Sequence, residues 1–150
     1  MNILVIIIGL ILQLSADFCQ TKQSQFLVEE QKSTGRLIYR SPNYLRWEYT
    51  SPMQLTWEIE GEKSNVSPQI KRLLKIIIQT IACENLESNT DFNVSHEGDM
   101  YNLVPQNREL KQFFTLIQLE IDPNTKIAKR VVLNEKNGDI TTINFYNVCL

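Results

Sequence analysis

The chain has 150 residues, 43% hydrophobic and 21% charged, which is an ordinary globular composition and enough for one domain with a real core. Its formal net charge of -2 argues against nucleic acid as the main partner, because phosphate binding requires a surplus of cations. We therefore expect a single, monomeric domain with no nucleic-acid partner.

The N-terminal segment is the first with a clear pattern. An apolar run over residues 3–12 is followed by small and polar residues, which is typical of an export signal peptide. Cleavage after Ala16 or after Cys19 would fit, and we predict a signal over residues 1–19 and an exported domain over residues 20–150. Two alternatives are an uncleaved anchor and lipidation of Cys19, as in a bacterial lipoprotein.

The next segments are expected to form strands, and in the last two of them apolar and polar residues alternate strictly, as in half-buried strands. The expected strands are residues 26–30, 36–40, 45–50 and 53–60. Gly35 is placed in a turn over residues 33–35, and Ser51-Pro52 joins the last two strands. One face of these strands collects the apolar side chains Leu37, Tyr39, Leu45, Trp47, Tyr49, Leu55, Trp57 and Ile59.

The period changes to that of a helix after Ser67, which is a suitable N-cap, with Pro68 at the first helical position. A helix to Ala82 places its apolar residues on one stripe: Ile70, Leu73, Leu74, Ile77, Ile78 and Ile81. Basic residues lie off this stripe, so a membrane-surface helix is one interpretation. We prefer an amphipathic helix packed on the sheet.

Further strands are expected over residues 92–96, 101–104, 114–121, 127–133 and 140–146. Asn137-Gly138 is a strong hairpin signal between the last two, and residues 107–112 are expected to form a helical turn. The fold class is therefore mainly β (α+β), with an antiparallel sheet that curls and one substantial helix against its face.

Residues capable of catalysis or metal binding are scarce. The single histidine, His96, excludes a multi-histidine metal site, and a nucleophilic pair with Cys83 has no supporting signature. Glu48 and Glu58 resemble a carboxylate pair, but they alternate with aromatic residues, and Arg46 is available to neutralise them. We predict no catalytic residues, no metal and no cofactor.

Two interpretations of the cysteines and of the aromatic face stay open. Cys83 and Cys149 can form a disulfide in an oxidising compartment, or act as two buried thiols, which we prefer slightly. The aromatic face is either the core beneath the helix or the wall of a cavity for an apolar ligand.

The stretch "GRLIYRSPNYLRWEYTSP" contains a Pro-Asn-x-x-x-Trp segment followed by Thr-x-Pro, and the tail contains Gly138-Asp139, Thr141-Thr142 and Phe145-Tyr146-Asn147-Val148. In both places the chain resembles the LolA-like outer-membrane lipoprotein carriers. The resemblance implies an unclosed β-barrel with a helical lid over a hydrophobic cavity, which takes the acyl chains of lipoproteins. It also implies transport across the periplasm, from an inner-membrane ABC-type release complex to an outer-membrane acceptor.

A lipid-binding set follows from the aromatic face together with the helix. It comprises Leu37, Tyr39, Leu45, Trp47, Tyr49, Leu55, Trp57, Ile59, Ile77 and Ile81. In several carriers an arginine stands immediately before the proline of the Pro-Asn-x-x-x-Trp segment and helps to hold the helical lid closed. In this chain Ser41 occupies that position. Arg40 and Arg46 flank it and are the candidate latch. A membrane-tethered acceptor and an envelope structural or interaction protein are the alternatives within this fold.

Overall fold

A computed structural model describes residues 13–40, 43–83, 86 and 88–150 of the chain. In chain order the elements are β1 (Gln13–Gln23), β2 (Gln31–Arg40), β3 (Tyr44–Ser51), β4 (Leu55–Glu60), β5 (Lys63–Ser64), α2 (Pro68–Ile81), β6 (Phe92–Glu97), β7 (Met100–Pro105), α3 (Arg108–Phe113), β8 (Phe114–Ile121), β9 (Ala128–Glu135) and β10 (Ile140–Cys149).

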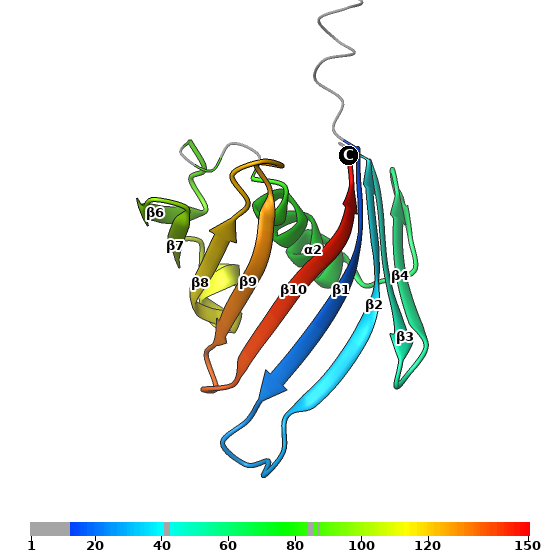
Figure 1. Cartoon of the computed structure of the whole chain (residues 1–150), viewed down its shortest axis with the longest axis horizontal. Coiled ribbons are helices and arrows are strands. Elements are labelled where there is room, and N and C mark those ends of the chain that lie inside the picture. The colour runs from blue at the N-terminus through cyan, green and yellow to red at the C-terminus, as the bar shows by residue number, and fades with distance from the viewer. Residues whose placement is uncertain (1–12, 41–42, 84–85, 87) are drawn as a thin grey trace, which may run out of the picture.

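The described strands form one ten-stranded sheet in the order β5-β4-β3-β2-β1-β10-β9-β8-β7-β6. Each neighbouring pair is antiparallel, and the first and last strands of the chain pair with each other in the middle of the sheet. The sheet curves around α2 but does not close, so β5 and β6 remain as its edges (Figure 1). This confirms the predicted mainly β class and the unclosed antiparallel barrel.

Helix α2 covers the inner face of the sheet, meaning the face toward which the sheet curves. Its start is as predicted, because Ser67 Oγ accepts a hydrogen bond from the backbone N–H of Ile70 at 3.3 Å and Pro68 occupies the first turn. Leu74, Ile78 and Ile81 of α2 are buried against the sheet. The apolar stripe read from the sequence is therefore a packing face, as expected of an amphipathic helix on a sheet.

The strand predicted over residues 26–30 and the turn over residues 33–35 were wrong, whereas residues 36–40 lie in a strand as predicted. Residues 24–30 form the turn between β1 and β2, and Gly35 lies inside β2, opposite Phe18 of β1 and Tyr49 of β3. A Cβ on Gly35 would overlap the carbonyl oxygen of Glu48 and would lie 2.5 Å from Phe18 Cζ. Glycine is therefore needed for close approach within the sheet rather than for a turn.

Strand β1 begins before the predicted end of the export signal. Gln13–Cys19 pairs with β2, and Phe18 has no exposed surface. The proposed signal leaves this strand complete only when cleavage falls before Gln13. Lipidation of Cys19, the second alternative, would require a chain that begins in the middle of β1.

A chain beginning at Gln13 is expected to unfold cooperatively, whereas a chain beginning at Gln20 is expected to show no cooperative transition. The shorter chain loses Phe18 from the core and most of the strand that joins β2 to β10. Thermal unfolding followed by circular dichroism compares the two. Equal midpoints would contradict a structural role for residues 13–19.

Candidate functional site

A pocket of about 340 Å³ lies between α2 and the inner face of the sheet. Its lining residues come from seven elements: Gln20, Lys22, Trp47, Tyr49, Trp57, Ile70, Leu73, Leu74, Ile77, Phe114, Leu133, Glu135, Thr141 and Ile143. A second hollow of about 430 Å³ is lined mainly by the ends of β2 and β4 and the β3–β4 turn, and shares Gln20 and Tyr49 with the pocket. We call the pocket between α2 and the sheet the cavity.

Aromatic rings form one wall of the cavity. The ring centroids of Trp47 and Tyr49 are 6.3 Å apart, and those of Tyr49 and Trp57 are 5.8 Å apart with nearly perpendicular planes. Phe18 packs beneath them, 4.5 Å from Trp47 and 5.5 Å from Tyr49. Because these ring contacts, one tilted and the others edge-on, hold the rings in place, the wall is a preformed apolar surface.

Tyr49 places a polar group at the border of the two hollows. Its hydroxyl donates a hydrogen bond to Gln20 Oε1 at 3.0 Å. Burial raises the pKa of this phenol, and the nearby polar groups of Trp47, Gln20 and Lys22 only partly offset that effect. The hydroxyl therefore remains a proton donor at neutral pH.

Helix α2 forms the roof of the cavity with Ile70, Leu73, Leu74 and Ile77. Ile70 is 40% exposed, and Leu73 and Ile77 are half-buried, so this part of the helix is not sealed against the sheet. Arg72 joins α2 to α3 through two hydrogen bonds to the Glu109 carboxylate, at 3.2 and 3.0 Å. Because both side chains are at least half exposed, this ion pair contributes little stability.

The predicted lipid-binding residues fall into two groups. Trp47, Tyr49, Trp57 and Ile77 line the cavity, and Leu55 lines the neighbouring hollow. The others lie in the packed core: Leu37, Tyr39, Leu45, Ile59 and Ile81. The aromatic face is therefore packed core over one part of the sheet and the wall of a cavity over another.

Neither candidate latch arginine lies on the inner face. Arg40 and Arg46 alternate with the buried Tyr39 and Leu45, so they occupy the outer face, which α2 does not cover. Arg46 pairs with Glu48 at 2.7 Å, two positions along the same strand, and not across strands as the sequence predicted. Arg40 lies over the Tyr44 ring, 5.2 Å from its centroid.

Ser41, which was predicted to replace the arginine of several carriers, lies outside the described residues. Glu58, the other carboxylate of the suspected pair, accepts a hydrogen bond from the Tyr44 hydroxyl at 3.0 Å. This contact is on the outer face as well, and it fits a structural role for both glutamates.

Sequence reasoning missed the polar residues at one end of the cavity: Gln20, Lys22, Glu135 and Thr141. Lys22 Nζ lies 3.5 Å from Glu135 Oε1, although 113 residues separate them in the chain. Phe18, Gln20 and Lys22 are at alternate positions of β1. Once β1 is recognised as a strand, this spacing places all three side chains on the same face of the sheet.

The cysteines and the histidine lie outside the cavity lining. The three cysteines are unpaired among the described residues; Cys149 is exposed, and burial raises the pKa of the half-buried Cys83 thiol to about 11. His96 stacks on Tyr101 with the ring centroids 4.5 Å apart. In the part of the chain that the structure describes, no group of three His, Cys, Asp or Glu residues is arranged to hold a metal ion.

The model of the family described as outer membrane lipoprotein carrier protein LolA matches residues 11–149. Solved structures similar to the chain at low sequence identity include the following two. NE2245, a LolA superfamily protein from Nitrosomonas europaea, is 10% identical with a TM-score of 0.49, and the match covers 92% of this chain and 86% of that one. The MucA/MucB complex of Pseudomonas aeruginosa contains a chain that is 12% identical with a TM-score of 0.47, covering 91% of this chain and 51% of that one.

The search of curated proteins gave no match. Among the described helices, none has the length and apolar character needed to cross a bilayer.

Proposed function

Because this chain belongs to the LolA family of outer membrane lipoprotein carrier proteins, we propose that its cavity binds the acyl chains of lipoproteins and releases them again without catalysis. Family membership confirms the resemblance found in the sequence. The observation that carries the proposal is the apolar cavity under α2, whose aromatic wall and helical roof enclose a space with one polar end.

The chemistry of the lining suits reversible binding. Transfer of a chain of about fifteen methylenes out of water is worth about 12 kcal/mol, at about 0.8 kcal/mol per methylene, so a perfectly fitted site would release its ligand too slowly for transport. Here the roof residues Ile70 and Leu73 are only partly buried, and the neighbouring hollow extends the space. Incomplete enclosure lowers the affinity and permits release.

Carrier activity would connect two membranes. We propose that the protein acts in the periplasm, takes acylated lipoproteins from an inner-membrane ABC-type release complex and delivers them to an outer-membrane acceptor. In this scheme α2 is the lid, and the Arg72–Glu109 ion pair is one of the contacts that must break when the lid opens.

Purification of the protein from its own cells, followed by mass spectrometry of bound lipid and protein, tests the proposal. Acylated lipoproteins in the purified fraction are the expected result. Acylation of Cys19 in the intact protein would instead support a tethered acceptor. An interior that carries no lipid and takes up no fluorescent fatty-acyl probe would leave only an envelope structural or interaction protein.

A further inference from the structure

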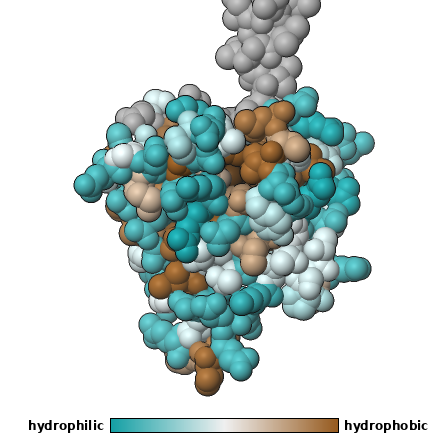
Figure 2. All heavy atoms as spheres, viewed as in Figure 1, coloured by the Kyte–Doolittle hydropathy of each residue, from teal (hydrophilic) through white to brown (hydrophobic). Residues whose placement is uncertain are grey.

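The turn between β1 and β2 carries an apolar tip, which consists of Phe26, Leu27 and Val28. Phe26 and Val28 are almost fully exposed, and Leu27 is exposed as well. The turn projects beyond the neighbouring turns at the same end of the molecule (Figure 1), and its hydrophobic point is visible at the lower end of Figure 2. Because three consecutive apolar side chains in water are unfavourable, the tip is a contact surface in search of a partner.

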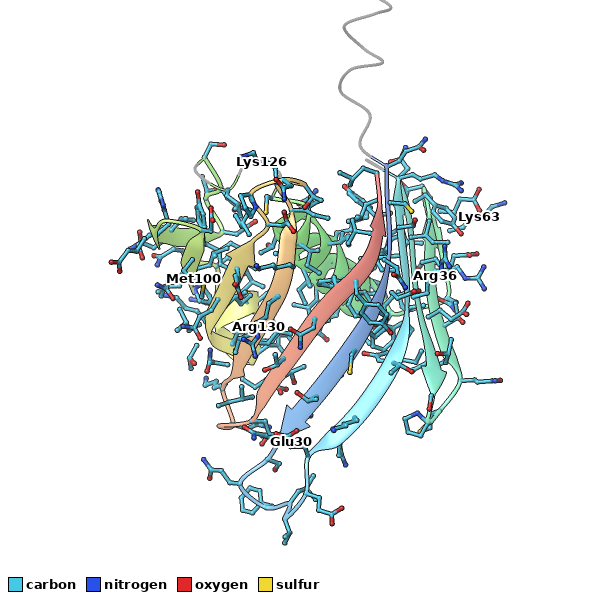
Figure 3. All side chains as sticks on the ribbon, viewed as in Figure 1. Glu30, Arg36, Lys63, Met100, Lys126 and Arg130 are labelled. Carbon is cyan, nitrogen blue, oxygen red and sulfur yellow. The ribbon has the colours of Figure 1, made fainter. Side chains whose placement is uncertain are left out.

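Contacts within the turn hold the tip in place. The backbone N–H of Leu27 donates to the carbonyl oxygen of Ser24 at 3.2 Å, and the backbone N–H of Phe26 donates to Ser24 Oγ at 3.3 Å. At the base of the turn, Gln23 Nε2 donates to Oε1 of Glu30 at 2.7 Å, and Glu30 is labelled in Figure 3. The tip is therefore presented to a partner in a defined shape, so less ordering is needed on binding.

The second hollow lies beside the tip. β1 and β3 run in the same direction, because both are antiparallel to β2, so the β1–β2 and β3–β4 turns share one end of the molecule (Figure 1). Residues 31–33, which follow the tip, form one side of the hollow, and Pro52, Met53 and Leu55 form the other. Met53 is 71% exposed and Leu55 is 43% exposed. A convex and a concave apolar surface are therefore adjacent.

This pair of surfaces fits a second copy of the same chain. When two copies face each other across a two-fold axis, the tip of each one meets the hollow of the other. The hollow has a volume of about 430 Å³, which is in the range of pockets that enclose a small organic molecule, so it has room for inserted side chains. Within the described part of the chain, no tip residue lines the hollow beside it, which leaves that space to another molecule.

Charges beside the two surfaces have opposite signs. Glu29 and Glu30 directly follow the tip, and Lys32 borders the hollow. Neither Glu29 nor Lys32 takes part in an ion pair with another described residue. A tip in the hollow would bring Glu29 toward Lys32 of the second copy, and symmetry would repeat this attraction.

A bilayer is the other surface that accepts an apolar tip, and two observations favour a second copy instead. Segments that lie on membranes carry Lys and Arg beside their apolar residues, whereas two glutamates follow this tip. The tip also projects beyond the β3–β4 turn, so a bilayer would cover the tip and leave Met53 and Leu55 in water. A second copy covers both surfaces in one contact.

We propose that two copies of this chain associate as a symmetric dimer, in which the apolar tip of each copy occupies the second hollow of the other. The contact is small, and its dissociation constant is expected to be on the order of 10 µM. Composition and charge pointed to a monomer, because neither records which apolar residues a turn exposes. The inference goes beyond acyl-chain binding and does not depend on it.

Sedimentation velocity of the purified protein between about 1 and about 200 µM measures the association. The average mass is expected to rise from that of one chain to that of two and to stop there, because the dimer uses both tips and both hollows. A mass of one chain throughout would overturn the inference. Growth beyond two chains would overturn it as well, since open-ended contacts do not have two-fold symmetry.

Variants on either side of the contact are expected to weaken the dimer by at least about ten-fold. Phe26→Ser removes the largest side chain of the tip, and Met53→Glu puts a charge in the hollow. Both residues are exposed in a single chain, so the domain is expected to stay folded. Met100→Glu is the matched control, because Met100 is 47% exposed on β7, away from the tip (Figure 3), and is expected to leave dimerisation unchanged.

A mixture of the two variants identifies what the tip binds. The mixed dimer keeps one intact contact, between the tip of the Met53→Glu protein and the hollow of the Phe26→Ser protein. With one of the proteins fluorescently labelled, mixed dimers are expected to form at least about three-fold more tightly than either variant dimer, because one of two contacts is restored. Tip-to-tip association would give no such gain and would overturn the inference.

A measurement on the unchanged protein keeps the test decisive when a variant does not fold. Carbodiimide joins amines to carboxylates in contact, and a mixture of isotope-labelled and unlabelled protein distinguishes cross-links between copies from those within one. Cross-links between copies are expected to join Lys32 to Glu29 or Glu30. Cross-links between copies that all lie elsewhere would overturn the inference.

A lipid surface is tested separately with phosphatidylcholine vesicles. Vesicle binding that Phe26→Ser abolishes, in a protein that forms no dimer, would identify a bilayer as the partner of the tip and overturn the inference. The proposed acyl-chain binding would stand in each of these cases, because the cavity and the tip are separate surfaces.

Discussion

Gly35→Ala is expected to lower the free energy of unfolding by about 3 kcal/mol or more, because strand β2 has no room for a methyl group there. The added Cβ would overlap the Glu48 carbonyl oxygen of β3 and lie 2.5 Å from Phe18 Cζ. Neither neighbour is free to move. The carbonyl belongs to the β2–β3 pairing, and the Phe18 ring is fixed between Trp47 and Tyr49. Urea unfolding at equilibrium measures the change.

Gly61→Ala is the matched control for this substitution. Gly61 has φ +58° and nothing within 4 Å of an added Cβ, so alanine there meets backbone strain but no collision. Its expected cost is about 1 kcal/mol. A Gly35→Ala protein that loses no more stability than Gly61→Ala would show that β2 and β3 can separate at this point, contrary to the packing described.

Leu73→Glu is expected to weaken binding of a fluorescent acyl probe by at least about thirty-fold while the domain stays folded, because it puts a carboxylate in the roof of the cavity. Leu73 is half-buried on α2 and lines the cavity, so in the free protein the new charge can reach water. Bound acyl chain would remove that water. Titration with the probe, together with thermal unfolding, separates the loss of binding from any loss of stability.

Two further variants bracket this result. Gln69→Glu adds the same charge to the exposed first turn of α2, where an acidic residue is tolerated, and is expected to leave binding unchanged. Leu45→Glu buries a charge at a position that is 3% exposed in the core, and is expected to unfold the domain. Loss of folding in Leu73→Glu as well would mean that the roof is core rather than cavity.

The exposed apolar turn between β1 and β2 has no role in the proposed mechanism of acyl-chain binding. The β1–β2 turn exposes Phe26 and Val28 almost completely, and Leu27 to 46%. The hydrophobic tip at the lower end of the molecule in Figure 2 lies at this turn. The sequence predicts a strand over residues 26–30, and its three consecutive apolar residues give no indication that they protrude into solvent.

Much of the architecture could be predicted because it depends on local periodicity. Alternation located β3, strand-like runs between turn residues located β8 and β10, the Ser67-Pro68 pair located the start of α2, and Asn137-Gly138 located the turn before β10, where Gly138 has φ +94°. These signals are read within a few residues, and packing reinforces them. Around Gly35 the same reasoning failed, because glycine serves a turn and a close strand contact equally well, and only the identity of the neighbour distinguishes them.

The sequence by itself determined which residues face inward on β3 and β4, where apolar and polar residues alternate, and its motifs indicated the family. It did not determine which inward residues are sealed and which border a space. Leu45 and Trp47 are two positions apart on β3 and both face inward, yet Leu45 lies in the core and Trp47 lines the cavity. The reason is that α2 packs closely over one part of the sheet and less closely over the other.

Tertiary structure alone also brought Lys22 to Glu135 and gave the cavity its polar end. The reason is that β1 pairs with β10, an association between the two ends of the chain that no local pattern encodes.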